Sequence, residues 1–202
     1  MGIIDRASAN LSILSGDIKM PASYETDRLY LKILKKSEKN KVLDYYCRNK
    51  CFLEEWDPHR PDGFYTKEYQ EQVLEKEYRS YEEGNLLKLW IFPKGEPSKV
   101  IGFIVFNNIV RGSFWSCHLG YKLDEDYINK GLITEALRKG IDIIFNDYKL
   151  HRIEANIMPK NARSLRVVEK LGFYNEGLAY KYLKIHGKWE DHIHWVLLNN
   201  RV

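Results

Sequence analysis

The hydrophobic residues in the second half of the chain recur with two periods, which predict strands followed by helices. Residues 151–157 alternate apolar and polar side chains, as a half-buried strand does. Residues 114–123 form the strand expected before it, and a loop with a single glycine, Gly131, separates that strand from a helix. The helix is predicted because its apolar residues lie three or four positions apart. These residues are Leu137, Ile141, Ile144, Phe145 and Tyr148.

The loop at residues 128–134 has the local chemistry of a phosphate-binding site. A helix start carries backbone N–H groups without partners inside the helix, and the positive end of the helix dipole adds to them. Such a start binds phosphate without a basic side chain. Thr134 and Glu135 are residue types that suit a first helical turn. An ordinary loop-to-helix junction has the same pattern, because one glycine is a weak signal by itself.

A second helix is predicted directly after the strand at residues 151–157. Pro159 ends the strand, and Asn161 is positioned to cap a helix that has Ser164 at its third position. Gly172 is expected as the left-handed residue that stops this helix. The apolar face is formed by Leu165, Val168 and Leu171, and Phe173 follows as a buried anchor.

The remaining pattern predicts two more helices and five more strands. One helix is expected at 37–51 with Ser37 as its cap, and another runs from Thr66, its cap, to Gly84. The stretch between them, 52–65, is rich in Pro and Gly and is expected to be a loop. The strands are expected at 30–34, 86–92, 100–109, 178–185 and 188–198, the last two joined by a tight His186-Gly187 turn. The strand at 100–109 is apolar on both faces, which places it in the centre of the sheet.

Composition narrows the class of protein. The 202 residues suit one domain, and 44% hydrophobic residues are enough for a globular core. A net charge of +4 is too small to indicate a nucleic-acid site. The chain has no run of about 20 apolar residues, so no membrane span is expected. The three cysteines are Cys47, Cys51 and Cys117; without a CxxC pair they favour a reduced, cytoplasmic protein, and no metal site is expected.

A strand, a glycine loop and helix, a second strand, a capped helix and then Leu-Gly-Phe form a specific order. In this order the chain resembles the GCN5-related N-acetyltransferase (GNAT) superfamily, whose members use acetyl-CoA. The loop at Gly131 corresponds to the pyrophosphate loop of that superfamily. Its second signature corresponds to Asn161-x-x-Ser164 and to Leu171-Gly172-Phe173.

Other segments resemble the RimJ/RimL group of ribosomal-protein N-acetyltransferases, and its RimJ branch most. They are Thr26-Asp27-Arg28-Leu29, Phe52 to Pro58, Val110 to Phe114, Leu119-Gly120-Tyr121, His151-Arg152-Ile153 and Gly187-x-Trp189-x-Asp191-His192. The match covers about residues 24–199, so these are expected to form a single acetyltransferase domain after an N-terminal extension at 1–23. Enzymes of the RimJ branch acetylate the N-terminal alanine of a small-subunit ribosomal protein, and the resemblance implies the same activity here.

The resemblance also implies an α/β (α+β) fold and a set of acetyl-CoA contacts. The fold is a twisted, mostly antiparallel sheet of about seven strands with about four helices, in which two neighbouring strands splay apart at the cofactor site. The pantetheine arm is expected along Leu119, Tyr121 and Leu123, and the phosphates at Asn129, Lys130, Gly131, Leu132, Ile133 and Thr134, with further contacts from Asn161 and Ser164.

Several positions depart from the superfamily pattern, including Ile133, where the pattern has Gly or Ala. Ile128 stands where the pattern has Gln or Arg, which removes a side-chain contact to phosphate but leaves the backbone N–H groups in place. Asn129 is tolerable in place of glycine because Asn adopts left-handed backbone more readily than most residues. Val168 stands where many members carry a tyrosine general acid, so Ser164 is the nearest hydroxyl that can protonate the leaving thiolate.

The base and the acceptor wall are less defined by the sequence. His118 lies on the strand before the phosphate loop, and a neutral imidazole can act as a base, so His118 is a candidate base or an ordinary strand histidine. Glu54, Glu55 and Asp57 are further candidates. Trp56 and Arg60 belong to the loop that forms the acceptor wall in this superfamily, and Tyr182 is expected to face the acceptor.

Three functions remain open from the residues alone. The first is acetylation of a protein N-terminus, the second is acetylation of a small amine such as a polyamine, aminoglycoside or amino acid, and the third is a non-catalytic ribosome-assembly factor on the same fold. Expected partners are acetyl-CoA and the acceptor, without nucleic acid or membrane, and the protein is expected to be a monomer or homodimer.

Overall fold

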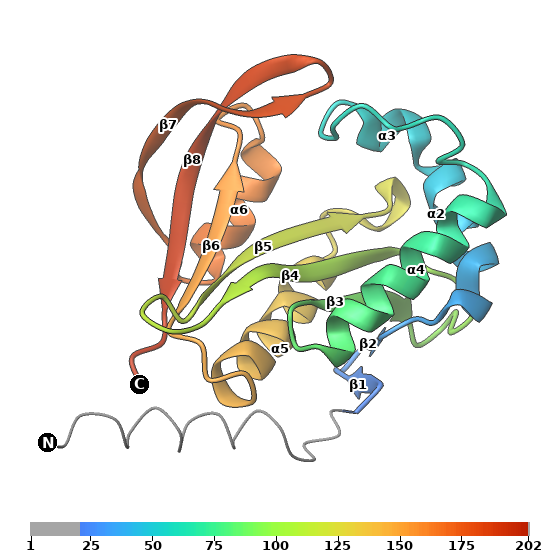
Figure 1. Cartoon of the computed structure of the whole chain (residues 1–202), viewed down its shortest axis with the longest axis horizontal. Coiled ribbons are helices and arrows are strands. Elements are labelled where there is room, and N and C mark those ends of the chain that lie inside the picture. The colour runs from blue at the N-terminus through green and yellow to red at the C-terminus, as the bar shows by residue number, and fades with distance from the viewer. Residues whose placement is uncertain (1–20, 202) are drawn as a thin grey trace, which may run out of the picture.

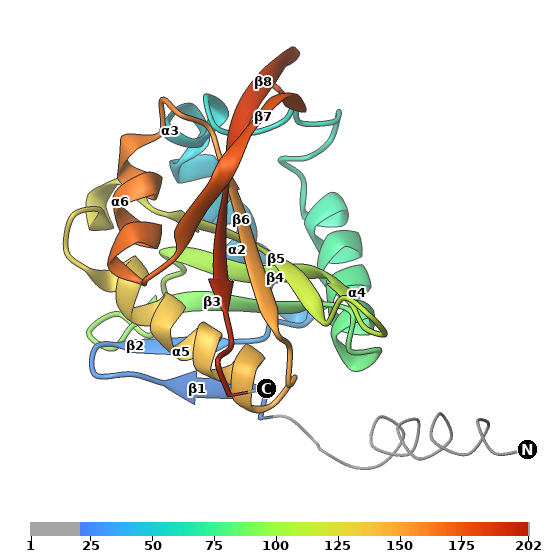
Figure 2. The same ribbon diagram turned by 90° about the vertical axis from the view of Figure 1, so that its left-hand side faces the viewer.

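A twisted sheet of eight strands runs through the molecule, with helices on both faces (Figures 1 and 2). The computed structural model describes residues 21–201. The strand order is β1-β2-β3-β4-β5-β6-β8-β7, and β5–β6 is a parallel pair in an otherwise antiparallel sheet. The strands are β1 (Ser23–Glu25), β2 (Leu29–Lys32), β3 (Leu87–Pro93), β4 (Gly102–Val110), β5 (Ser116–Leu123), β6 (Arg152–Ile157), β7 (Tyr174–Ile185) and β8 (Lys188–Leu198).

The helices divide between the two faces of the sheet, as Figure 2 shows. One face carries α5 (Leu132–Asn146) and α6 (Ala162–Lys170), which share one core, and the other carries α2 (Lys39–Arg48) and α4 (Lys67–Glu82), which share a second core. The short α3 (Lys50–Glu54) follows α2 directly, and 3-10 turns occur at η1 (Lys36–Glu38) and η2 (Glu125–Tyr127).

Each face has its own apolar core. Leu137 and Ile144 of α5 are fully buried against Ile104 and Phe106 of β4. The packing at Gly140 is so close that a Cβ there would lie 2.6 Å from the Ile104 side chain. On the other face, the aromatic rings of Tyr45, Trp90 and Phe103 pack edge to face or tilted.

The sheet splits where β5 and β6 meet. These strands pair only over Ser116–His118 and Arg152–Glu154, although β5 continues to Leu123 and β6 to Ile157. The expected splay between two neighbouring strands is therefore present, and the mixed α/β architecture and central position of β4 are also confirmed.

Several local predictions are confirmed at the level of single residues. The Thr66 hydroxyl accepts a hydrogen bond from Tyr69 N–H, and Asn161 accepts one from Ser164 N–H, so both residues cap their helices. Gly172 has a φ of 83° directly after α6. His186 and Gly187, with φ of 45° and 83°, form the turn between β7 and β8.

The helix predicted at 37–51 is different in the structure. Ser37 lies within η1 and does not cap a helix, and α2 begins at Lys39. Asn49 leaves the helical backbone with ψ of 13° and separates α2 from α3. Its side-chain amide donates to Tyr45 O and Asp124, so a buried polar contact replaces helix continuity. The helical residues of α3 also extend into the segment predicted as a loop.

The strand β1 was not predicted and makes the sheet one strand wider. It pairs with β2, with Ser23 opposite Lys32. Ser23, which was predicted to belong to the N-terminal extension, is therefore part of the sheet. Residues 1–20 of the predicted N-terminal extension lie outside the described residues. Within 21–201, no helix is long and apolar enough to cross a membrane, and no cluster of His, Cys, Asp or Glu is arranged to hold a metal ion.

Candidate active site

A cavity of about 430 Å³ occupies the gap between β5 and β6. We call it the cofactor cavity. Its walls are residues 119–123 of β5, the loop before α5, the end of β6 and one face of α6. Because the strands are not paired beyond His118 and Glu154, backbone groups of both strands face this gap.

The loop before α5 has the geometry of an anion site. Asn129 and Gly131 both adopt left-handed backbone, with φ of 59° and 74°. This conformation turns the chain sharply into α5. Residues 131–134, at the start of that helix, line the cavity, and a helix start carries backbone N–H groups without partners inside the helix. The prediction that Asn129 substitutes for glycine is therefore consistent with its observed backbone.

Contacts from the turn between β1 and β2 fix the loop from one side. Glu135, in the first turn of α5, accepts hydrogen bonds from Thr26 Oγ1 at 2.6 Å and from Arg28 Nε at 2.7 Å. Arg28 also donates to the carbonyl oxygen of Lys130 at 2.9 Å. The Thr-Asp-Arg-Leu segment thus holds the phosphate loop in place.

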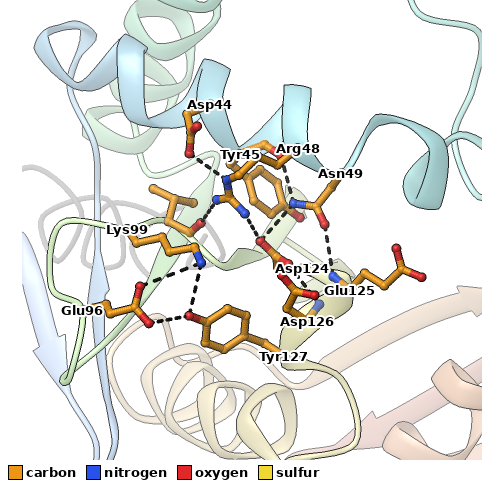
Figure 3. A network of polar contacts seen from close by, with 11 residues as sticks. Asp44, Tyr45, Arg48, Asn49, Glu96, Lys99, Asp124, Glu125, Asp126 and Tyr127 are labelled. Carbon is orange, nitrogen blue, oxygen red and sulfur yellow. Dashed lines mark hydrogen bonds and ion pairs between the residues drawn. The ribbon is translucent and has the colours of Figure 1, made fainter.

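A buried polar network fixes the loop from the other side (Figure 3). Asp124, only 2% exposed, accepts hydrogen bonds from Arg48 and from Asn49 at 3.1 Å. Asn49 Oδ1 in turn accepts from Glu125 N–H at 3.1 Å. Burial alone would raise the pKa of Asp124, but the hydrogen bonds from Asn49 and Arg48 lower it below its usual value.

Helix α6 closes the cavity opposite the phosphate loop. Ser164 lines the cavity, while its backbone N–H is capped by Asn161 and its carbonyl oxygen accepts a hydrogen bond from Tyr121 at 3.0 Å. These contacts use only the backbone of Ser164. Val168, which stands where many members of the superfamily carry a tyrosine general acid, is fully buried in the core.

The same helix presents a basic face to the cavity. Three of its residues line the cavity with cationic side chains at helical spacing, and they are Arg163, Arg166 and Lys170. Residues three and four apart share one face of a helix, so these charges are neighbours in space. They suit the several phosphate groups of a coenzyme A.

A second cavity of about 440 Å³ lies between the segment 54–66 and the tip of the β7–β8 hairpin. We call it the acceptor cavity. Its lining includes both signs of charge, from Glu54, Asp57 and Asp62 and from Lys50 and Arg60. The guanidinium of Arg60 lies 4.0 Å from the Phe64 ring centroid, which holds this cation against the aromatic wall.

At the point where β5 and β6 part, ionisable side chains surround one carboxylate. Glu154 lies 3.3 Å from His194 Nδ1 and 3.8 Å from His118 Nε2. Although burial acts to raise the pKa of Glu154, hydrogen bonds from Arg152 and Asn156 lower it overall. Asn156 lines the cofactor cavity, and its buried Oδ1 has no hydrogen-bond partner among the described residues.

The cysteines do not form a nucleophilic site. Cys47 and Cys51 are exposed on α2 and α3, and neither lines a cavity described above. Cys117 is fully buried, and burial raises the pKa of its thiol to about 12. A thiol in this state is a poor nucleophile near neutral pH.

Comparison with known proteins identifies the family. The model of the acetyltransferase (GNAT) domain matches residues 28–174, which include β2 to β6, both loop-helix units and the start of β7. The chain belongs to the GNAT family of acetyltransferases. As in that family, it is an N-acetyltransferase that transfers an acetyl group from acetyl-CoA to an amine.

Three relatives of this GNAT enzyme cover most of its length. The ribosomal protein uS5-alanine N-acetyltransferase of Escherichia coli is 36% identical over 170 residues, 83% of this chain and 86% of the relative. The Vibrio fischeri ribosomal-protein-S5-alanine acetyltransferase structure is 35% identical, with a TM-score of 0.85 over 89% of this chain and 98% of its own. Mycobacterium smegmatis RimJ, in complex with CoA-disulfide, is 25% identical with a TM-score of 0.80 over 86% and 83%.

The structure brings most of the predicted cofactor residues of this GNAT enzyme together. All of them line the cofactor cavity except Lys130, whose ammonium group donates to Asp126 O. Gly120 also lines this cavity, and a Cβ at that position would lie 3.2 Å from the Val105 side chain of β4.

The predicted catalytic and acceptor residues are more dispersed. Ser164 and Trp56 line the cofactor cavity, and Arg60 lines the acceptor cavity. His118 and Tyr182 line neither; the Tyr182 ring packs 4.7 Å from the ring of His194.

Sequence reasoning missed several residues that line the cofactor cavity. They are Phe52, Leu53, Lys122, Asn156, Arg163, Arg166, Lys170, Leu183, Ile185 and His192. The three basic residues of α6 had a visible signal in their helical spacing, which the reasoning did not use. Lys122 and Asn156 had none, because a polar residue on a half-exposed strand face is ordinary.

Proposed function

We propose that this enzyme acetylates the N-terminal amine of a protein, with an alanine-starting ribosomal protein as the acceptor. The observation that carries the proposal is the similarity to enzymes named for this acceptor, which extends over 83% of the chain at 36% identity. The structure of the V. fischeri enzyme, named for the same acceptor, superimposes on 89% of the chain with a TM-score of 0.85. A ribosomal acceptor would place the enzyme in the cytoplasm.

The chemistry of the acceptor cavity supports a peptide over a polyamine. A site for a polycation needs an excess of negative charge, whereas this lining pairs Glu54, Asp57 and Asp62 with Lys50 and Arg60. Aromatic rings of Tyr46, Phe64 and Tyr65 supply apolar surface for the first side chains of a peptide. The α-amino group also suits the reaction, because its pKa of about 8 leaves part of it neutral near pH 7.

In this proposal, residues of the two cavities and of the neighbouring cluster around Glu154 divide the work of the transfer. The backbone N–H groups of residues 129–134 bind the phosphates, and the unpaired edge at residues 119–123 binds the pantetheine arm. Ser164 donates a proton to the departing thiolate. His118 receives the proton of the acceptor amine, directly or through water, while Glu154 orients its ring. Trp56, Arg60 and Tyr182 contact the acceptor.

The proposed acceptor is tested with a panel of substrates. Peptides beginning with Ala, Ser or Met are compared with a polyamine, an aminoglycoside and free amino acids, using acetyl-CoA consumption and product mass as readouts. Preference for the Ala-starting peptide is expected. Acetylation of small amines alone would identify a small-amine enzyme, and CoA binding without transfer to any amine would identify a non-catalytic factor.

The two proton-transfer roles have separate tests. Ser164→Ala should lower kcat while leaving the KM for acetyl-CoA unchanged, because the backbone contacts of Ser164 remain. His118→Ala should change the shape of the pH–kcat profile between about pH 6 and 8. An unchanged profile would remove His118 from the mechanism.

A further inference from the structure

One ion pair separates the two cavities. Lys122 of β5 lines the cofactor cavity, and Asp57, in the segment between α3 and α4, lines the acceptor cavity. The ammonium group of Lys122 contacts the Asp57 carboxylate, and Leu53 lines both cavities beside this pair. An amine that enters from the acceptor cavity therefore meets the pair before it reaches the cofactor.

The Asp57 carboxylate is fixed independently of Lys122. Its other oxygen contacts the guanidinium of Arg60, and its backbone carbonyl accepts a hydrogen bond from His186 N–H at 3.1 Å. The side chain is only 3% exposed. Since the loop and the hairpin tip both hold Asp57, the carboxylate keeps its place if Lys122 moves away.

From this geometry we propose that the Asp57 carboxylate binds the ammonium group of the acceptor, and that Lys122 occupies this position until the acceptor displaces it. The inference rests on the proposed function, because it requires an acceptor that carries a primary amine. It assigns Asp57 to substrate binding and makes the Asp57–Lys122 pair a gate between the cavities.

The chemistry of the exchange is balanced. An α-ammonium group offers the same charge and the same three N–H donors as the lysine ammonium, so it replaces one cation by another at Asp57. The Arg60 contact remains in both states. The displaced lysine keeps its proton, so the number of protons and the net charge are the same before and after the exchange. Burial lowers the pKa of Lys122 to about 7, so its charged form is already disfavoured where it sits beside Asp57.

The gate also explains how the product leaves. An acetylated amine is neutral and has one N–H, so it competes poorly with lysine for a buried carboxylate. Lys122 then regains its partner and expels the product. The gate thus selects for free amines and against acetylated ones.

Opposite changes in two variants test the gate. Asp57→Asn should weaken binding of the acceptor peptide by about tenfold or more, because the amide lacks the negative charge. Lys122→Met should strengthen peptide binding several-fold, because the competing cation is gone while Arg60 still holds Asp57. Binding is measured by calorimetry on the enzyme saturated with CoA, with the Ala-starting peptide and its N-acetylated form. The KM for acetyl-CoA should change by less than about threefold in both.

Lys88→Met is the matched control. Lys88 is more buried than Lys122, with 9% against 23% of its side chain exposed, and pairs with Glu77 at 2.6 Å, but it lines neither cavity. Its loss should lower the melting temperature without changing peptide affinity. If Asp57→Asn does not fold, Lys122→Met and Lys122→Arg decide the question, since Arg should bind Asp57 more firmly and weaken the peptide.

The outcomes separate this inference from the proposed function. If the wild-type enzyme acetylates no peptide, the proposed function fails, and the gate fails with it. If the wild-type enzyme acetylates the peptide, but Lys122→Met weakens peptide binding or leaves it unchanged, the gate alone is wrong. Tighter binding in Lys122→Met together with weaker binding in Asp57→Asn supports it.

Discussion

Left-handed backbone at Asn129 and Gly131 gives the phosphate site its shape. A β-branched residue at Gly131 would have to adopt a φ of 74°, and its Cβ would lie 3.5 Å from an Arg28 nitrogen. Such strain costs about 1–3 kcal/mol where the surroundings enforce the conformation. The loop can relieve that strain only by moving away from the position that faces the phosphates.

We therefore expect Gly131→Val to lower CoA affinity by at least about tenfold, which corresponds to about 1.4 kcal/mol. The measurement is calorimetry on the folded variant. Gly112→Val is the control, because Gly112 has a φ of 73° in the β4–β5 turn, away from the cofactor cavity. Equal affinities in the two variants would contradict the assignment of the loop.

The network around Asp124 leads to a prediction about stability and pH. Asp124→Asn should lower the free energy of unfolding by about 2 kcal/mol at pH 7, because hydrogen bonds to a buried charge are lost. The pKa of Asp124 is lowered in the folded state, so its contribution exists above the unfolded pKa, about 3.9. The difference between variant and wild type should shrink as pH falls below about 4, through the folded pKa.

Denaturant unfolding at pH 7 and at lower pH measures this effect. Asp126→Asn is the control, since it changes an exposed carboxylate on the same turn and should alter stability by less than about 0.5 kcal/mol. A difference at Asp124 that stays constant down to pH 2 would show that shape rather than charge is responsible.

At the scale of single residues, the sequence predicts the roles of residues whose interaction partners lie close to them along the chain. The Asn161 cap, the stop at Gly172 and the left-handed Asn129 each follow from local backbone chemistry. The Asp57–Lys122 pair does not, because its partners come from different elements and each resembles an ordinary surface charge. Long-range polar pairs are decided by packing, which a single sequence does not display.

Helix α6 combines two functions in nine residues. Its start is capped by Asn161 and presents Ser164, while its cavity face carries Arg163, Arg166 and Lys170. The sequence predicts the helical period of these residues. It does not predict that their face of α6 lies toward the cavity between β5 and β6, because this depends on how α6 packs beside the splayed strands. The split of the predicted helix at Asn49 has a similar origin, since its cause is the distant Asp124.

We expect the basic face of α6 to bind the 3′-phosphate of CoA. Arg166→Ala should weaken binding of CoA several-fold and leave binding of dephospho-CoA almost unchanged, because only CoA carries the charge that Arg166 meets. Arg138→Ala is the control, as Arg138 is exposed on the neighbouring α5 but does not line the cavity. Equal losses for the two ligands would place Arg166 elsewhere on the cofactor.

At the scale of the whole molecule, the proposed sites for the two substrates are neighbours, which favours direct transfer without a covalent relay. The cofactor and acceptor cavities meet at Leu53, whereas none of the cysteines lines either cavity. Proximity of an amine to a thioester supplies much of the barrier reduction that a covalent intermediate would otherwise give.

A variant with Cys47→Ser, Cys51→Ser and Cys117→Ala should keep kcat within several-fold of the wild type. Alanine is chosen at position 117 because a buried hydroxyl would lack a partner. Initial-rate kinetics should give intersecting lines, as expected for a ternary complex. Parallel lines, or an acetylated cysteine found by mass spectrometry, would contradict direct transfer.

The splay between β5 and β6 has a consequence for aggregation. Exposed strand edges present unpaired N–H and C=O groups that recruit strands from other chains. This sheet carries two such edges in its interior, beyond His118 on β5 and beyond Glu154 on β6. Helix α6 and the β7–β8 hairpin flank them (Figure 1). The pantetheine arm of CoA is narrow and carries amide groups, so it can reach these edges, whereas a strand of a neighbouring protein cannot. Unpaired edges that would promote aggregation at the surface therefore do not do so in the interior of the sheet.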